Sequence, residues 1–235
     1  MNQRLDPAEI IETIGALQRR IEERFPNANL GSFCGEVLAV ARKAEVRTAW
    51  IRRPIFGLRI GVGLVIFGLF TILIRVGVGV APTPDRPSIV DFVQSAEALL
   101  SSLVIVGAAA FFLATLELRI KRMRALSAIH GLREMVHLVD MHQLTKDPAP
   151  PPGQRPDTES SPERTMTPYE LSRYLDYCSE MLALLSKIGA LYARDLNDPV
   201  VLSGVDGLQG LADGLSQKIW NKMNIVNRQI GGSFD

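Results

Sequence analysis

Two long apolar runs separate segments with helical amphipathic patterns. Residues 60–74 and residues 99–116 contain no charged side chain. With its flanking residues, each run is long enough to cross about 30 Å of hydrocarbon as a helix. In a single chain such runs must be helical, because a bilayer offers no water to bond the backbone polar groups. The pattern predicts a transmembrane hairpin over residues 54–118, with spans at about 56–80 and 98–118 and an outer loop at 82–97.

Apolar residues at helical spacing fill the segments on both sides of this hairpin. Residues 1–53 predict two amphipathic helices, and the pattern after the second run continues without proline through a stalk helix over 119–146. Residues 147–167 are rich in proline, which predicts an extended linker. Residues 168–232 carry two further apolar series and predict an antiparallel helical hairpin. The predicted fold class is all-α, a two-transmembrane helical hairpin with a cytoplasmic helical bundle.

Three predicted helix starts have recognisable capping residues. Asp6 precedes a proline, which is favoured at the first position of a helix. Thr167 is followed three residues later by Glu170, the spacing of a capping box. Asp198 follows a short polar turn and precedes Pro199, so it is predicted to cap the last helix.

The distribution of charge predicts the orientation of the hairpin. The whole chain of 235 residues has a net charge of +1, which gives no reason to expect a nucleic-acid partner. Basic residues are concentrated before the first span and after the second, whereas Arg86 is the only basic residue in the segment 82–97. By the positive-inside rule both termini are therefore predicted to be cytoplasmic. The charged N-terminal region lacks the pattern of a removable signal peptide.

Several residues near the ends of the spans are predicted to contact the lipid bilayer. Tryptophan and arginine are common at the level of lipid headgroups, and an arginine just inside a span can extend its side chain to the surface. The predicted membrane-interface residues are Trp50, Arg52, Arg53, Arg75, Lys121 and Arg122. Gly57 and Gly61 have the spacing of a helix-packing motif, which leaves open whether the spans pack within one chain or between copies.

One face of the stalk helix carries residues that are able to bind metal. His130, Glu134, His137 and Asp140 follow one another at steps of four, three and three, so they lie on one side of a helix. Such a set can hold a single zinc or iron ion. The alternative interpretation is a polar face that packs on the C-terminal hairpin, with Arg133 paired to one of the carboxylates. No cofactor-binding motif is present, and no cofactor is predicted.

Three blocks in the C-terminal half resemble an uncharacterised bacterial family of two-transmembrane proteins. They are HLVDMHQLTKDP at 137–148, RYLDYCSEMLALLSKIGALYA at 173–193 and GLSQKIWNKM at 214–223. The resemblance implies a bacterial inner membrane but no activity, and it assigns no catalytic residue. Cys34 and Cys178 are far apart and are interpreted as small packing residues in a reducing compartment.

The leading hypothesis is a non-enzymatic scaffold, sensor or oligomeric assembly that acts through its cytoplasmic helices. Its partner is a second copy or another protein, and Tyr174 and Trp220 are predicted to be central contacts because large aromatic residues dominate packed interfaces. A metal-dependent membrane enzyme that uses the histidine face is the alternative. An oligomeric pore or a transporter accessory subunit is a third possibility.

Overall fold

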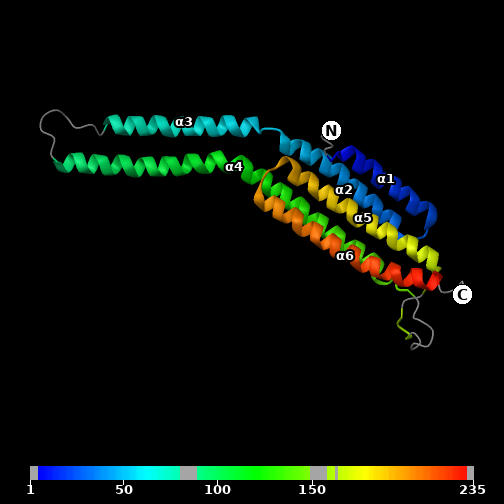
Figure 1. Cartoon of the computed structure of the whole chain (residues 1–235). Coiled ribbons are helices and arrows are strands. Elements are labelled where there is room, and N and C mark those ends of the chain that lie inside the picture. Colours follow the sequence, from blue (N-terminus) through cyan, green and yellow to red (C-terminus); the bar gives the residue numbers. More distant parts are fainter. Residues whose placement is uncertain (1–4, 80–88, 149–157, 162–163, 232–235) are drawn as a thin grey trace. The chain divides into compact units, whose positions relative to one another are not determined.

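The chain is helical in nearly all of the part that the structure describes. The structure is a computed structural model and describes residues 5–79, 89–148, 158–161 and 164–231. The described residues form helices and no strand (Figure 1), which confirms the predicted all-α class. The helices are α1 (Pro7–Arg24), α2 (Asn29–Arg52), α3 (Phe56–Gly79), α4 (Ile89–Leu144), α5 (Pro168–Asp195) and α6 (Pro199–Gly231).

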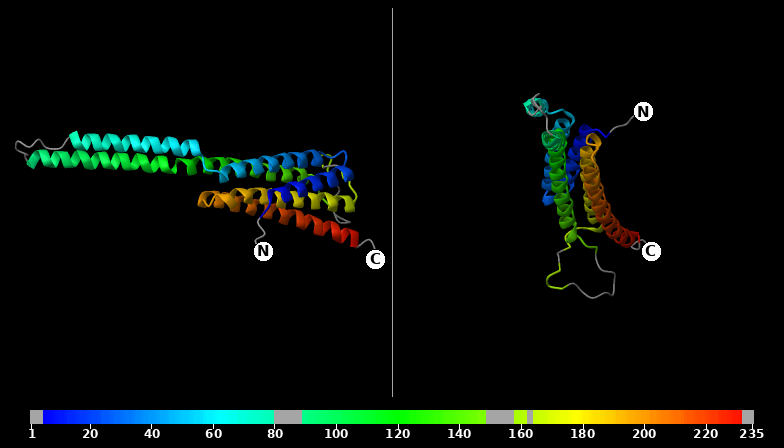
Figure 2. Two further views of the ribbon diagram at one scale, coloured as in Figure 1. Left: turned by 90° about the horizontal axis from the view of Figure 1, so that it is seen from above. Right: turned by 90° about the vertical axis from the view of Figure 1, so that its left-hand side faces the viewer.

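These helices belong to two compact units. The bundle unit comprises residues 1–52 and 124–235, and the hairpin unit comprises residues 53–123. Helix α4 contributes to both, because it begins in the hairpin unit and ends in the bundle unit. Within the bundle unit, the last part of α4 contacts α2, α5 and α6, while α1 packs on α2 and α5 (Figures 1 and 2). The N-terminal helices, the stalk and the C-terminal hairpin therefore share one hydrophobic core.

The first two predicted caps are present. The Asp6 carboxylate accepts a hydrogen bond of 3.0 Å from the backbone N–H of Ala8 at the start of α1. At the start of α5, the Thr167 hydroxyl accepts from the Glu170 N–H at 3.2 Å, and the Glu170 carboxylate accepts from the Thr167 N–H at 2.8 Å. The second bond favours the charged carboxylate and lowers the pKa of Glu170. Both helix starts are thus determined by local sequence.

Helix α6 begins at the predicted cap, and Pro54 separates α2 from α3. Asp198 is buried, and its Oδ1 accepts from the N–H groups of Val200 and Val201 at 3.0 and 3.2 Å. Helix α2 ends at Arg52, two residues before Pro54, as expected because proline disfavours a helical conformation at the preceding residue.

The core of the bundle unit is built from one apolar stripe on each helix. On α1 the buried residues are Ile10, Ile14, Leu17 and Ile21, which follow at steps of four, three and four. Phe25 lies in the turn after α1 and packs edge-on against two tyrosines of α5, with centroid distances of 5.6 Å to Tyr174 and 6.3 Å to Tyr177. This turn therefore ties the N-terminal helices to α5.

Helices α4 and α6 lie alongside each other in the same direction. A Cβ at Gly204 of α6 would lie 3.3 Å from a methyl carbon of Leu126 and 3.6 Å from one of Ile129. Further along α4, a guanidinium nitrogen of Arg133 lies 2.5 Å from where a Cβ of Gly207 would be. At these two glycines, the lack of a side chain allows α4 and α6 to pack closely. Gly189 of α5 likewise allows close packing against Leu208 of α6.

A glycine substitution pair tests this packing. A Cβ at Gly189 would lie 2.5 Å from a methyl carbon of Leu208, which is fully buried. Gly189→Ala is therefore expected to lower the free energy of unfolding by about 1 to 3 kcal/mol. Gly210→Ala, where no described atom lies within 4 Å, is expected to raise it by about 0.5 to 1 kcal/mol. Denaturant unfolding in detergent measures both, and equal effects would contradict the close packing.

The end of α4 is held by three other helices. Lys222 of α6 donates to the Gln143 carbonyl at 3.0 Å and forms an ion pair of 2.8 Å with Asp147. The Tyr174 hydroxyl donates to the His142 carbonyl at 3.3 Å. The His142 ring lies 5.1 Å from the ring of Phe33 on α2. These contacts satisfy carbonyl groups that a helix end leaves without intrahelical partners.

The two predicted loops differ from the structure or lie outside the described residues. The outer loop was predicted over 82–97, but α4 begins at Ile89, so the prediction is wrong for residues 89–97. This stretch contains no proline or glycine and is able to be helical although it is too polar for a span. Residues 82–88 lie outside the described residues. So do residues 149–157 and 162–163, which are most of the predicted linker.

Candidate functional site

The hairpin unit carries a large apolar surface on α3 and on the first part of α4. Many of its large apolar side chains are exposed, the largest exposed fraction being 70% at Phe111. The exposed residues are Phe56, Ile60, Leu64, Val65, Phe67, Phe70 and Ile74 on α3 and Val93, Leu100, Leu103, Val104, Ile105, Phe111, Phe112 and Leu118 on α4. A soluble monomer rarely exposes a contiguous apolar surface of this extent.

Two stretches of the described chain are long and apolar enough to cross a membrane. They are Asn29–Thr71 and Leu100–Leu144, and no part of the most apolar window of either stretch is buried. A core helix of a soluble protein would bury such a window against other helices. The exposure therefore favours contact with lipid.

A cluster of polar groups joins the start of α3 to α4 within the hairpin unit. The Glu117 carboxylate of α4 lies 2.7 Å from Arg59 Nε and 2.8 Å from Lys121 Nζ. It also accepts from the N–H of Ile55 at 3.3 Å, while Lys121 donates to the Arg53 carbonyl at 2.9 Å. We call these five residues the Glu117 cluster. The sequence did not predict the pairing of Glu117 with Arg59, because 58 positions separate the two residues.

The predicted membrane-interface residues differ in burial and in their contacts within the chain. The prediction for Lys121 is not supported, because its side chain is buried in the Glu117 cluster and its ammonium group bonds protein atoms. Trp50 is half-buried, and the guanidinium carbon of Arg124 lies 4.1 Å from its ring centroid, so the ring has a cation–π partner within the bundle unit.

The four remaining interface candidates differ in exposure. Arg52, Arg53 and Arg75 are exposed, and Arg122 is half-buried. Exposure leaves these side chains accessible to headgroups, and their membrane contacts stay predictions.

The histidine face does not form a metal site in the described residues. No group of three or more histidine, cysteine, aspartate or glutamate side chains lies close enough there to hold a metal ion. His130, Glu134 and His137 are exposed on α4, and Asp140 accepts a hydrogen bond of 2.6 Å from Gln143. These residues share one face of α4, but among the described residues no other helix places a further metal-binding side chain next to them. The structure gives the metal hypothesis no support.

The alternative interpretation was a polar face that packs on the C-terminal hairpin, with Arg133 paired to a carboxylate. The structure agrees with it only in that Arg133 lies against α6. His130, Glu134 and His137 are exposed rather than covered by another helix. Arg133 instead reaches α6 at Gly207. The face is therefore a solvated surface of the bundle unit.

The two aromatic residues predicted as central contacts have opposite environments. Tyr174 is 3% exposed, and its burial raises the pKa of its hydroxyl. Trp220 is 56% exposed, so it is not part of the core of the bundle unit. On α6 the buried stripe passes through Leu215 and Ile219, and Trp220 follows on the outer side. Whether Trp220 contacts a partner stays a prediction.

Both cysteines are buried packing residues, as the sequence indicates. Cys34 and Cys178 are 0% exposed. Burial raises the pKa of each thiol to about 12, so little thiolate forms near neutral pH. Neither residue is suited to be a nucleophile.

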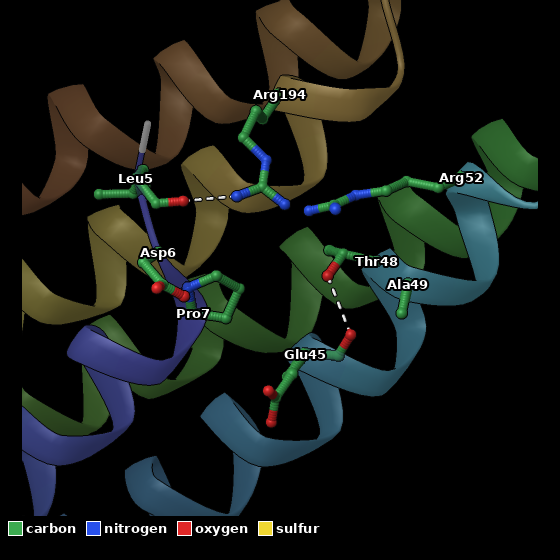
Figure 3. Close-up of a pocket in the computed structure, with 8 residues that line it drawn as sticks. All are labelled: Leu5, Asp6, Pro7, Glu45, Thr48, Ala49, Arg52 and Arg194. Carbon is green, nitrogen blue, oxygen red and sulfur yellow. Dashed lines mark hydrogen bonds between the residues drawn. The ribbon is translucent and has the colours of Figure 1, made fainter. Parts of the chain in front are cut away.

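A pocket near the C-terminal ends of α2 and α5 contains two arginines. Its volume is about 400 Å³, and the residues that line it are Leu5, Asp6, Pro7, Glu45, Thr48, Ala49, Arg52 and Arg194. The guanidinium groups of Arg52 and Arg194 point toward each other (Figure 3). Arg194 donates a hydrogen bond to the Leu5 carbonyl. The sequence did not predict this pairing, because 142 positions separate the two arginines.

Comparison of the chain with family models, with curated proteins and with solved structures found no match. The resemblance of the three C-terminal blocks to a bacterial two-transmembrane family therefore stays a prediction.

Proposed function

We propose that the chain is an integral protein of a bacterial inner membrane, with α3 and the first part of α4 as its two spans. The observation that carries this proposal is the exposure of the apolar side chains on both helices. Burial of apolar area from water contributes about 25 cal/mol per Å², so a bilayer would stabilise this surface strongly. The basic residues that flank the hairpin support cytoplasmic termini and a cytoplasmic bundle unit.

Within the membrane, the protein acts as a non-enzymatic scaffold or sensor. Helix α4 supports this role, since it runs unbroken from Ile89 to Leu144 and belongs to both units. A continuous helix is stiff, so a displacement of its apolar part is transmitted to its other end. The bundle unit has its own closed core and presents Trp220 on its surface, a residue type that is common in the centre of protein interfaces.

Self-association through α3 is a second candidate. Gly57 and Gly61 have the packing-motif spacing, and among the described residues no atom lies within 4 Å of a Cβ built at either position. The small-residue face is therefore open to a helix of another chain. This supports the oligomeric alternative over packing within one chain.

Cysteine labelling tests the orientation. A cysteine introduced at Ser88 is expected to react with a membrane-impermeant thiol reagent added to intact cells, because the segment between the spans is proposed to face outward. A cysteine at Ser160 is expected to react only after the cells are opened. The parent protein serves as the control, since Cys34 and Cys178 are buried and should stay unlabelled in both conditions. Labelling of Ser160→Cys in intact cells would overturn the orientation.

A further inference from the structure

We propose that the outer groove between α5 and α6 binds the same groove of a second copy of the chain, which gives a dimer with two-fold symmetry. The groove contains a pocket of about 230 Å³ that both helices line. It belongs wholly to the bundle unit, so its geometry does not depend on membrane insertion. A second copy would be the partner that the scaffold role requires, and only this role rests on the proposed function.

Small side chains line the groove on both helices. Helices α5 and α6 pack along each other in opposite directions (Figure 1). On α5 the small residues follow at steps of three and four, the spacing of a helix–helix seam. A helix of another chain can approach closely there, because the distance between packed helices decreases with the size of the side chains in contact. The small residues are Ala183, Ser186 and Ala190 on α5 and Ala212 and Ser216 on α6.

The two charged residues of the groove have opposite signs. Lys187 of α5 and Asp213 of α6 line the same pocket, and both are exposed. In the described part of the chain, neither forms an ion pair or a side-chain hydrogen bond. Because they lie at the same level, a two-fold axis along the groove would place Lys187 of each copy opposite the partner's Asp213. The groove is thus complementary to itself, as a two-fold interface requires.

Trp220 extends the same surface along α6. Asp213, Ser216 and Trp220 follow at steps of three and four, so they share one side of the helix. Trp220 is 56% exposed, although the preceding residue, Ile219, is buried. Tryptophan is among the residues that contribute most to the stability of protein interfaces, because its ring buries a large apolar area. A second copy on the groove would cover this ring.

Ser186 has a hydroxyl group that lacks a partner in the single chain. Its Oγ atom is buried, and among the described residues it has no hydrogen-bond partner. Buried polar groups in folded proteins nearly always have one. Ser186 lines the groove, so rotation about its Cα–Cβ bond turns the hydroxyl toward a polar group of the second copy.

Charge reversal with rescue tests the pairing of Lys187 with the partner's Asp213. The full chain is purified in a neutral detergent, and the dissociation constant of the dimer is obtained from the protein mass over a dilution series. Lys187→Asp and Asp213→Lys each place like charges opposite each other, so each is expected to weaken the dimer at least about tenfold. Lys187→Asp/Asp213→Lys exchanges the charges and should restore the dissociation constant to within about threefold of the parent value.

Lys218→Asp and Glu134→Lys are the matched controls. They make the same two charge changes at exposed positions that do not line the groove. Both variants should dimerise like the parent. A parent that stays monomeric at every concentration, an equal loss in the controls, or the absence of rescue in the double variant would each overturn the proposal.

Trp220→Ala separates docking from folding. The variant is expected to weaken the dimer at least about tenfold, as for a tryptophan at the centre of an interface. At high dilution, where the parent is monomeric, its unfolding temperature should stay close to that of the parent, because the exposed ring contributes little to the core. Dimerisation as tight as that of the parent would contradict the proposed surface.

Gly57→Leu/Gly61→Leu distinguishes this dimer from self-association through α3. The double variant should leave the dissociation constant unchanged. A dimer that is weakened by this variant and insensitive to the charge reversals belongs to α3 and overturns the proposal. Extraction of membranes at alkaline pH reports separately on insertion of the hairpin, so failure of the membrane proposal is distinguishable from failure of this one.

Discussion

Tyr177→Ala is expected to lower the free energy of unfolding of the bundle unit by about 3 to 5 kcal/mol, as for other large aromatic side chains that are truncated in a core. Tyr177 is 1% exposed and is one of the largest fully buried side chains. Its ring packs edge-on against Phe25, and the guanidinium carbons of Arg173 and Arg20 lie 5.1 and 5.8 Å from its centroid. The substitution therefore removes contacts from α5 to the turn after α1 as well as creating a cavity.

Tyr169→Ala is the matched control, because it changes the same residue type on the same helix. Tyr169 is 59% exposed, and its described ring contact is the guanidinium of Arg24 at 5.8 Å. An exposed cation–π contact contributes about 0.5 to 1 kcal/mol, so the control should lose no more than this. Thermal and denaturant unfolding of the purified protein in detergent measure both. Equal losses in the two variants would show that the core around Tyr177 is not packed as described.

Val65→Asp is expected to prevent stable insertion of the first span. Val65 is 49% exposed near the middle of α3. An aspartate at the centre of a transmembrane helix costs about 2.5 to 3.5 kcal/mol on insertion scales, which corresponds to a shift of roughly 100-fold in the insertion equilibrium. The protein should then be extracted from membranes at alkaline pH or be degraded. The parent should stay in the membrane fraction.

Val46→Asp makes the same change on the surface of the bundle unit. Val46 is 69% exposed on α2, so in water an aspartate there should change stability by no more than about 0.5 kcal/mol. This variant is expected to remain membrane-bound like the parent. If Val65→Asp were as well tolerated as Val46→Asp, the exposed face of α3 would be in contact with water and the membrane proposal would be wrong.

Local sequence signals predicted the described helices well. The caps at Asp6, Thr167 and Asp198 are present, because each needs only residues two or three positions away. The break at Pro54 has the same local origin. The predicted loop over 82–97 was too long, since hydropathy marks where a span ends and not where a helix ends.

Helical periodicity predicted which face of a helix is buried but not which helix covers it. Tyr174 continues the apolar series of α5 and lies in the core, whereas Trp220 directly follows Ile219 of the buried stripe of α6 and is exposed. His130 and His137 share a face of α4, but no other described helix brings ligands to it. A one-dimensional spacing is necessary for such a site and is not sufficient.

The all-α class, the helix starts and the two apolar runs are predictable from the sequence, because they depend on residue type, local hydrogen bonding and periodicity. Which distant residues meet depends instead on how whole helices pack. This packing joins Arg59 to Glu117, places Arg194 against Leu5 beside Arg52, and brings Gly204 of α6 against α4. Each of these contacts joins segments at least 50 positions apart. Their formation depends on the packing of whole helices, which no local pattern in the chain encodes.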